Sequence, residues 1–471
     1  MTATQPSSVT APGAHAPHLR PQAHFTARDT WLNDPNGLVF HDGVWHLFFQ
    51  NNPSGSTWGN ISWGHAVSRD LVSWTELPVA IAATSEEMVF SGSAVVDAHN
   101  TSGLAGAGET ALVAVYTSSY TAHSERPGIQ AQSLAYSVDD GATWHRYAGN
   151  PVLDIGSGEF RDPKVFWHGG DDGRWIMVAV EATEHRVAIY SSPNLVDWSL
   201  ESRFGPAHAT GGVWECPDLF PLRVRGTDEE KWVLVVSLNP GGIAGGSGTQ
   251  YFVGDFDGTA FTPDRVVEDG GIEDYDWLDH GPDYYAGVSF SGAPGGRRVT
   301  IAWASNWAYA NSTPTEPWRS AMSLARSLDL VRCADGRLRV AQSPVLPSPD
   351  DLPDGVLVHR LVVPTRPGER SEIALTAGDP ASAERVQIVL DGSSRTLTCD
   401  RTAGGDTGFH ADFPGSFQAP LQGAQLTDLT IVVDGCVVEV YADGGLATVT
   451  MLVFPSAPLT EVSLEGAHAD R

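Results

Sequence analysis

A repeated pattern in the first two-thirds of the chain restricts the fold more than any other feature. A short apolar strand, a polar turn and an aromatic residue that opens a further strand recur over residues 66–74, 135–144 and 189–198, with a weaker copy over 252–261. The aromatic residues stand at positions 74, 144, 198 and 261, which are 70, 54 and 63 residues apart. This spacing is typical of four-stranded propeller blades with long loops.

Each copy of the repeat follows an apolar stretch that could line a propeller axis. These stretches begin near Asp34, Gly92, Asp162, Cys216 and Asp283, so the sequence predicts five blades. No long segment of the sequence places apolar residues at i, i+3, i+4 and i+7, and we therefore expect few helices.

The composition changes after the repeats. All 15 tryptophans lie at or before Trp318, and the proline- and aspartate-rich residues 344–355 have the composition of a linker. Beyond it come short alternating strands, including 429–433 and 437–441 around Asp434-Gly435, which is a strong hairpin signal. We therefore predict an all-β chain with a mobile tail over 1–22, a five-bladed β-propeller over 23–343, a linker over 344–355 and a β-sandwich over 356–471.

The net charge of -29 restricts the partners, because such a surface repels phosphate backbones and anionic lipids. We expect neither nucleic acid nor a membrane as a partner, and a neutral substrate fits best. The apolar runs have the length of strands and are too short to span a bilayer. Residues 1–20 contain no basic start followed by an apolar block, which predicts a cytoplasmic protein if the chain is complete as given, and a secreted one if a leader was removed.

The 16 histidines and four cysteines show no spacing typical of metal ligands. We therefore expect no metal site and no cofactor, and we expect the cysteines to be buried free thiols.

Two motifs place a carboxylate directly before a proline: residues 33–37 (Asn-Asp-Pro-Asn-Gly) and 161–163 (Arg-Asp-Pro). A third, residues 215–217 (Glu-Cys-Pro), repeats this layout with one residue inserted. Proline lacks an N–H and suits the first position of a strand, so Asp34, Asp162 and Glu215 should occupy equivalent points on three strands that point at a common axis. Each motif alone has a plain structural explanation: an Asx-turn, a surface ion pair and a solvated carboxylate. Their recurrence at matching positions favours one shared site.

Three converging acids suit the cleavage of a glycosidic bond. Retaining cleavage needs a nucleophilic carboxylate and a protonated acid about 5–5.5 Å apart. Asp34 is the better nucleophile, because the neighbouring Asn33 and Asn36 would keep it ionised. Glu215 is the better acid/base, because two nearby aspartates favour its protonated form. Asp162, held charged by Arg161, would bind sugar hydroxyls and stabilise positive charge on the ring.

Amide, hydroxyl and aromatic side chains near these motifs could contact a sugar. These candidates are Gln50, Trp58, Ser91, Asn239, Trp303 and Trp307. Trp74, Trp144 and Trp198 recur in the repeat, so we expect them to pack between blades.

The acidic motifs, together with residues 90–93 (Phe-Ser-Gly-Ser) and 283–286 (Asp-Tyr-Tyr-Ala), resemble glycoside hydrolase family 32, the β-fructofuranosidases, over nearly the whole chain. The resemblance implies a five-bladed propeller, a C-terminal β-sandwich and a retaining mechanism. It makes Asp34 the nucleophile, Glu215 the acid/base and Asp162 the transition-state stabiliser. The substrate contacts that it implies are Asn33, Gln50, Trp58, Phe90, Ser91 and Arg161. Residues 301–309 are similar to the microbial inulinase and levanase branch.

The leading hypothesis is a hydrolase that releases terminal β-D-fructofuranosyl units from levan, inulin or sucrose through a covalent fructosyl-enzyme intermediate. Its partner would be a fructose-containing oligo- or polysaccharide. A fructosyltransferase, including one that forms a difructose anhydride, would use the same three acids. A non-catalytic carbohydrate-binding propeller is a weaker hypothesis, because all three acids are present. An arabinan- or xylan-cleaving enzyme would also use three acids, but the sequences around Asp34 and Glu215 weigh against it. The motifs leave open the linkage, exo or endo action, and the oligomeric state.

Overall fold

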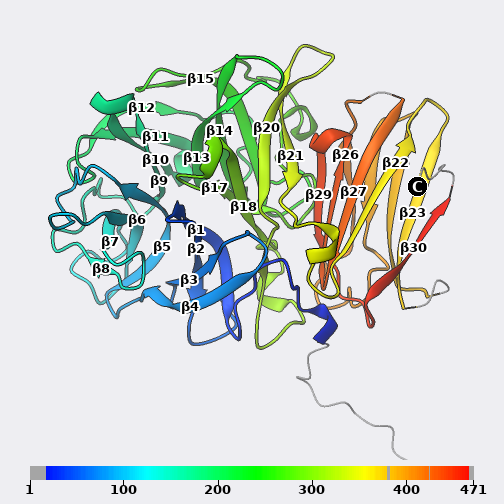
Figure 1. The fold of residues 1–471 in the computed structure, drawn as a ribbon, viewed down its shortest axis with the longest axis horizontal. Helices are drawn as coiled ribbons and strands as arrows, with labels where there is room; N and C mark the ends of the chain where they lie inside the picture. Colours follow the sequence, from blue (N-terminus) through cyan, green and yellow to red (C-terminus); the bar gives the residue numbers. More distant parts are fainter. Residues whose placement is uncertain (1–16, 379–381, 424, 466–471) are drawn as a thin grey trace, which may run out of the picture.

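The computed structural model describes residues 17–378, 382–423 and 425–465, and its regular structure is almost entirely β (Figure 1). The helical elements in these ranges are three-residue 3-10 turns, which confirms the expectation of few helices. They are η1 (Pro17–Leu19), η2 (Gly170–Asp172), η3 (Ala182–Glu184), η4 (Ile272–Asp274), η5 (Pro294–Gly296), η6 (Ala310–Ser312), η7 (Pro349–Asp351) and η8 (Asp443–Gly445).

Five antiparallel sheets form the blades of a propeller, as predicted (Figure 1). Blade 1 contains β1 (Trp31–His41), β2 (Val44–Asn52), β3 (Ser62–Ser68) and β4 (Trp74–Ile81). Blade 2 contains β5 (Glu87–Asp97), β6 (Ala111–Tyr120), β7 (Gln130–Ser137) and β8 (His145–Arg146). Blade 3 contains β9 (Phe160–His168), β10 (Arg174–Glu181), β11 (Arg186–Ser192) and β12 (Ser199–Phe204). Blade 4 contains β13 (Val213–Arg223), β14 (Glu230–Asn239), β15 (Gly248–Phe256) and β16 (Phe261–Pro263). Blade 5 contains β17 (Tyr285–Ser289), β18 (Arg298–Ala304), β20 (Arg326–Arg332) and β21 (Leu338–Pro344), and the short β19 (Ala321–Met322) pairs with β18.

The first strand of each blade is innermost, and β1, β5, β9, β13 and β17 contact one another in turn around the axis. Backbone hydrogen bonds join the last blade to the first. The Phe40 N–H donates to the Ser291 carbonyl at 2.9 Å, and the Ser291 N–H donates to the Leu38 carbonyl at 2.9 Å. The Leu32 N–H likewise donates to the carbonyl of Arg319, which precedes β19, at 3.1 Å. The ring of blades is therefore closed.

All five inner strands contain a shift in pairing register close to their N-terminal ends. The shifts fall between Leu32 and Pro35, Phe90 and Gly92, Arg161 and Lys164, Glu215 and Asp218, and Tyr285 and Val288. Pro35, Pro163 and Pro217 lie in or beside these shifts and inside their strands, so the prediction that they open the strands is wrong. A bulge leaves a residue without a ladder hydrogen bond, and proline is tolerated there.

The sequence repeat corresponds to the turn between the third and fourth strands of blades 1 to 4. Trp74 and Phe261 open β4 and β16, whereas Trp144 and Trp198 directly precede β8 and β12. The three tryptophans are partly buried and pack against apolar clusters of the propeller, which confirms their expected packing role.

The C-terminal region forms the predicted β-sandwich around its own apolar core. One sheet contains β22 (Leu357–Pro364), β27 (Leu426–Asp434), β28 (Val437–Ala442) and β29 (Ala447–Leu452). The other contains β26 (Ser416–Pro420), β25 (Thr396–Asp400), β24 (Arg385–Asp391), β23 (Arg370–Ala377) and β30 (Leu459–Glu465). The predicted hairpin joins β27 to β28, and the predicted linker joins β21 to β22.

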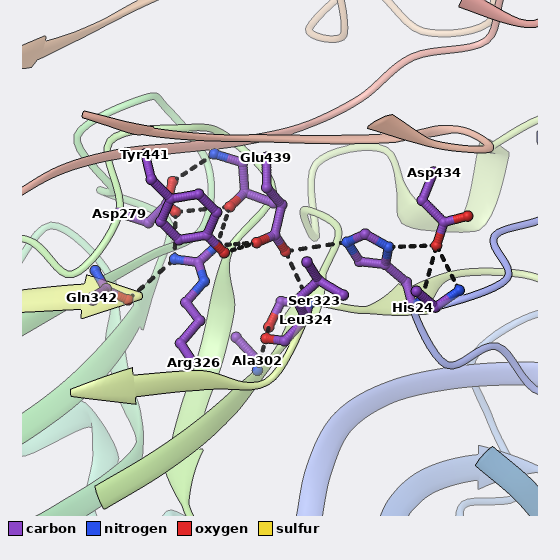
Figure 2. Close-up of polar contacts among 12 residues, drawn as sticks. His24, Asp279, Ala302, Ser323, Leu324, Arg326, Gln342, Asp434, Glu439 and Tyr441 are labelled. Atoms are coloured by element: carbon purple, nitrogen blue, oxygen red, sulfur yellow. Dashed lines mark hydrogen bonds and ion pairs between the residues drawn. The ribbon is translucent and has the colours of Figure 1, made fainter. Parts of the chain in front are cut away.

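A buried network of charges holds the sandwich against blade 5 (Figure 2). Arg326 on β20 contacts Asp279 at 2.9 Å and Glu439 on β28 at 3.1 Å. His24 lies 2.7 Å from Asp434 and 3.3 Å from the other oxygen of Glu439. Buried charges are costly unless each faces an opposite one, so this network fixes how the two parts fit together.

The N-terminal segment differs from the prediction of a mobile tail over 1–22. Residues 1–16 lie outside the described residues, but residues 17–22 pack on the sandwich. The Leu19 side chain is buried, its carbonyl accepts from the Cys436 N–H at 2.8 Å, and the Gln22 N–H donates to Asp434 at 2.7 Å. The apolar side chain and the Asp434 carboxylate thus give this segment a fixed place.

Candidate active site

A cavity of about 340 Å³ lies where the bulged inner strands meet, and Asp34, Asp162 and Glu215 all line it. Pockets for small ligands have volumes of roughly 300–1,000 Å³, so this one suits a sugar unit. Its lining residues are Asn33, Asp34, Gln50, Trp58, Phe90, Ser91, Gln130, Glu159, Arg161, Asp162, Glu215 and Trp307. The structure therefore brings together the three predicted acids and six of the predicted contact residues from the motifs, along with Trp307.

The bulges aim the acids at the axis. Asp34 lies inside the bulge of β1, Asp162 inside that of β9, and Glu215 directly precedes that of β13. Asp162 and Cys216 adopt left-handed backbone conformations, with φ of 63° and 47°. Such conformations cost on the order of 1–3 kcal/mol each in residues other than glycine and occur most often at functional sites. Bulges are also the usual device for re-aiming a strand side chain.

Cys216 connects the two aspartates. Its N–H donates to Asp162 Oδ2 at 3.0 Å, and its Sγ lies 3.6 Å from Asp34 Oδ2 and 3.8 Å from Asp162 Oδ2. The Ser91 hydroxyl also donates to Asp34 Oδ2 at 2.8 Å. Among the described residues, the buried Oδ1 of Asp34 has no hydrogen-bond partner. This oxygen also has almost no exposed surface, so it is an unpaired acceptor at the base of the site.

Arg161 and Tyr285 hold Glu215. Glu215 Oε1 accepts from Arg161 Nε at 3.2 Å and Nη2 at 3.1 Å, and Oε2 accepts from the Tyr285 hydroxyl. Arg161 Nη1 donates to Glu159 at 2.7 Å, while its Nε is 3.8 Å from Asp162. Arg161 was expected to hold Asp162 charged. Burial raises the pKa of Asp162 and outweighs the charge of Arg161, which does lower it, and the hydrogen bonds of the guanidinium are directed at Glu215 and Glu159.

Burial and mutual repulsion dominate the electrostatics of the two aspartates. Burial, together with the charge of Glu215, raises the pKa of Asp34 to about 6, against the opposing hydrogen bonds from Ser91, Asn33 and Cys216. Burial likewise raises the pKa of Asp162, although Arg161 opposes the rise. Of the two amides expected to keep Asp34 ionised, Asn36 instead donates to the backbone carbonyl of Asp34. A pocket with this much negative charge favours positive charge on its ligand.

Of the three tryptophans predicted to contact a sugar, two line the cavity and one does not. Trp58 is 42% exposed on the cavity wall, and its ring meets that of Phe90 edge-on at 6.2 Å. Trp307 lines the cavity and packs against Trp31. Trp303 is fully buried beside Trp31 and Tyr285, so the prediction that it lines the pocket is wrong.

Asn239 is also absent from the cavity lining. It ends β14, and its side-chain oxygen accepts from the Ser247 hydroxyl at 3.4 Å. Proximity to a strand end was its only sequence signal, and that signal does not specify which way a side chain points.

Three residues around the acids were not predicted: Gln130, Glu159 and Tyr285. Glu159 precedes Arg161 by two residues, and the alternation of strand side chains could have placed it on the same side. Tyr285 lies inside the 283–286 motif. Gln130 has no distinguishing sequence signal.

Within the described ranges, no cluster of three or more His, Cys, Asp or Glu side chains could bind a metal ion. Cys216, Cys399 and Cys436 are buried free thiols, and Cys333 is a half-buried one. The described part of the chain contains no helix with the length and apolarity needed to cross a bilayer.

Two family models cover the chain. The model described as glycosyl hydrolases family 32 N-terminal domain matches residues 24–344, and the one described as glycosyl hydrolases family 32 C terminal matches residues 363–470. The chain belongs to glycosyl hydrolase family 32. Family 32 members related to this chain include an extracellular exo-inulinase of Aspergillus niger, which is 41% identical over 96% of this chain and 93% of its own length. A levanase of Bacillus subtilis is 41% identical over 95% of this chain and 68% of its own length.

The crystal structure of an exo-inulinase from Aspergillus awamori superimposes with a TM-score of 0.85 and 39% identity over 96% of both chains. The predicted family 32 resemblance and its architecture, a five-bladed propeller followed by a β-sandwich, are thus confirmed. The protein is a glycoside hydrolase of the fructofuranosidase type.

Proposed function

We propose that the protein hydrolyses the bond to a terminal β-D-fructofuranosyl unit of fructans and of sucrose, with retention of configuration. The observation that carries the proposal is the convergence of Asp34, Asp162 and Glu215 on one cavity with room for little more than a sugar unit. The names of the related exo-inulinase and levanase support a fructan as substrate.

In the first step, Asp34 attacks the anomeric C2 of the fructosyl unit, and the C2–O bond to the leaving group breaks. Glu215 gives its proton to the departing oxygen, so the products are a fructosyl ester of Asp34 and an intact leaving-group alcohol. The position of Asp34 in the cavity lining supports the role of nucleophile. Its Oδ2 is held by Ser91 at 2.8 Å, which fixes the orientation of the carboxylate.

In the second step, Glu215 takes a proton from water, and the resulting hydroxide attacks C2. The ester bond breaks, fructose leaves, and Asp34 returns to its ionised form. The Arg161 guanidinium and the Tyr285 hydroxyl keep the Glu215 carboxylate in place through both steps.

Asp162 supports both steps without forming a bond. It faces the site from the bulge of β9, and in our proposal it accepts hydrogen bonds from ring hydroxyls and stabilises positive charge that develops on the ring. The Cys216 N–H holds its Oδ2 at 3.0 Å. Asn33, Gln50, Trp58, Phe90 and Ser91 complete the walls around the sugar.

The test is a time course of products from sucrose, inulin and levan with the wild-type protein and with Asp34→Asn and Glu215→Gln. Free fructose as the first product supports hydrolysis of terminal units, and each variant should lose at least about 1,000-fold in kcat/KM. The exposed Asp228→Asn serves as a charge-matched control that keeps full activity. Near wild-type fructose release by Asp34→Asn contradicts the proposal, and a difructose anhydride as the main product assigns the chain to transfer instead.

A further inference from the structure

One arginine of the β-sandwich reaches into the propeller and is completely buried there. Arg401, which directly follows β25, donates from Nη1 to Asp283 Oδ2 at 2.5 Å and from Nη2 to the Tyr309 hydroxyl at 2.9 Å. The Tyr309 hydroxyl donates in turn to Asp283 Oδ1 at 2.5 Å. Arg401, Asp283 and Tyr309 therefore form a closed triangle between the two parts of the protein.

The sandwich fixes the guanidinium from its own side. Arg401 Nε donates to the Phe413 carbonyl at 2.7 Å, Nη1 donates to the Leu452 carbonyl at 3.1 Å, and the group lies 3.8 Å from the centre of the Phe413 ring. The Leu452 N–H also donates to Asp283 Oδ2 at 2.8 Å. A planar donor group held at several atoms gives its partners one orientation.

Both propeller members of the triangle lie two residues from a residue of the active site. Asp283 precedes Tyr285, whose hydroxyl donates to Glu215. Tyr309 follows Trp307, which lines the cavity. The two segments are also joined to each other, because Asn306 Nδ2 donates to the Pro282 carbonyl at 2.8 Å.

We propose that the β-sandwich contributes a positioning residue, Arg401, which through Asp283 and Tyr309 sets the positions of Tyr285 beside Glu215 and of Trp307 in the cavity wall. This inference rests on the proposed role of Glu215. It gives the single acid of the 283–286 motif a function, because Asp283 accepts from the guanidinium and Tyr285, two residues later, contacts Glu215. Small displacements of positioning groups can cost roughly 100-fold in rate, so a contact outside the cavity can matter.

The same interface contains a second buried ion pair. Arg326 contacts Glu439 at 3.1 Å (Figure 2). Both are as deeply buried as Arg401 and Asp283. The guanidinium packs over the ring of Tyr284 at 4.2 Å, whereas the Glu439 carboxylate is directed at the Leu324 N–H, 2.9 Å away, and at the Tyr441 hydroxyl. Arg326 also contacts Asp279 and Gln342. None of these residues lines the cavity. Glu439→Gln is therefore a control for a general weakening of the interface.

The experiment measures kcat and KM for fructose release from sucrose, and the melting temperature, for Tyr309→Phe, Arg401→Lys, Tyr285→Phe, the double variant Tyr309→Phe/Tyr285→Phe and Glu439→Gln. Tyr309→Phe is the mildest change, because it removes one hydroxyl and no charge. We expect a loss of about tenfold in kcat/KM for Tyr309→Phe. In the double variant the two losses should combine to less than their product, because both act through Glu215. Glu439→Gln should melt earlier and keep kcat/KM within about twofold.

Wild-type kcat/KM in a folded Tyr309→Phe variant overturns the inference, as do losses that multiply fully with those of Tyr285→Phe. An equal loss in Glu439→Gln overturns it as well, because the effect would then be general. These failures differ from a failure of the proposed function, in which the wild-type protein itself releases no fructose or Asp34→Asn retains its activity.

Discussion

Replacing Asp34 by asparagine should make the protein more stable at neutral pH while it abolishes turnover. The carboxylate is buried next to Glu215, and this burial raises its pKa from 3.8 to about 6. A shift of that size means that keeping Asp34 ionised in the folded protein costs about 3 kcal/mol relative to the unfolded chain. Asparagine removes the charge, can still accept the Ser91 hydrogen bond, and can direct its amide at the remaining carboxylates.

The pH dependence distinguishes this cost from an ordinary packing effect. The unfolded aspartate ionises near its usual pKa, whereas the folded one stays protonated up to about pH 6. The cost is therefore absent below about pH 3.8, grows between the two values, and is complete above about pH 6. The gain of Asp34→Asn over the wild type should follow the same course.

Calorimetric melting of both proteins between pH 4 and pH 8 tests this prediction. With an unfolding entropy of roughly 2.1 cal/mol/K per residue, the 471-residue chain gives about 1 kcal/mol/K, so the full gain corresponds to about 3 °C when the chain unfolds as one unit. The exposed Asp228→Asn should leave the melting temperature unchanged. A variant that melts at or below the wild type at pH 7.5, or a gain that persists at pH 4, refutes the reasoning.

Three further predictions concern single side chains. Ser91→Ala removes a hydrogen bond that lowers the pKa of Asp34, so the acid limb of kcat/KM, expected near pH 6 in the wild type, should move to higher pH; a limb that stays in place contradicts this role. Trp58→Ala removes an exposed aromatic wall and should raise KM about tenfold with little change in kcat, whereas a loss in kcat alone would argue against a binding role. Burial lowers the pKa of His24, but hydrogen bonds to Asp434 and Glu439 outweigh it and raise this pKa to about 9. The stability that protonated His24 contributes is therefore complete below about pH 6.5 and is lost as the pH rises through about 9. The melting temperature of His24→Gln should fall less over this range than that of the wild type. Parallel plots of melting temperature against pH for the two proteins would show that His24 does not contribute in this way.

The sequence was sufficient to predict the architecture and the convergence of the three acids, because both depend on repetition. Asp34, Asp162 and Glu215 lie at or beside the bulges of the inner strands of blades 1, 3 and 4, and a closed ring brings these places together. The detailed position of the prolines was mispredicted, because proline also suits a bulge and the sequence does not distinguish a bulge from a strand start.

Side chains without a repeated context were harder to place. Trp303 and Trp307 have similar surroundings in the sequence, yet one is fully buried and the other lines the cavity. Gln130 reaches the site from β7, which is not an inner strand, so no local pattern indicates it. The direction of Arg161 toward Glu215 depends on how blades 3 and 4 meet, which is a property of the whole ring.

The closure of the ring between Phe40 and Ser291 has a consequence for when the active site can form during synthesis and folding. Blade 1 holds Asp34, but the strand that seals it is made some 250 residues later, so the pocket is assembled from the two extremes of the propeller. A nascent or clipped chain that lacks its last blade would hold all three acids and still leave them unconfined. Sugar cleavage is therefore expected only after blade 5, which ends at Pro344, has been made and has paired with blade 1.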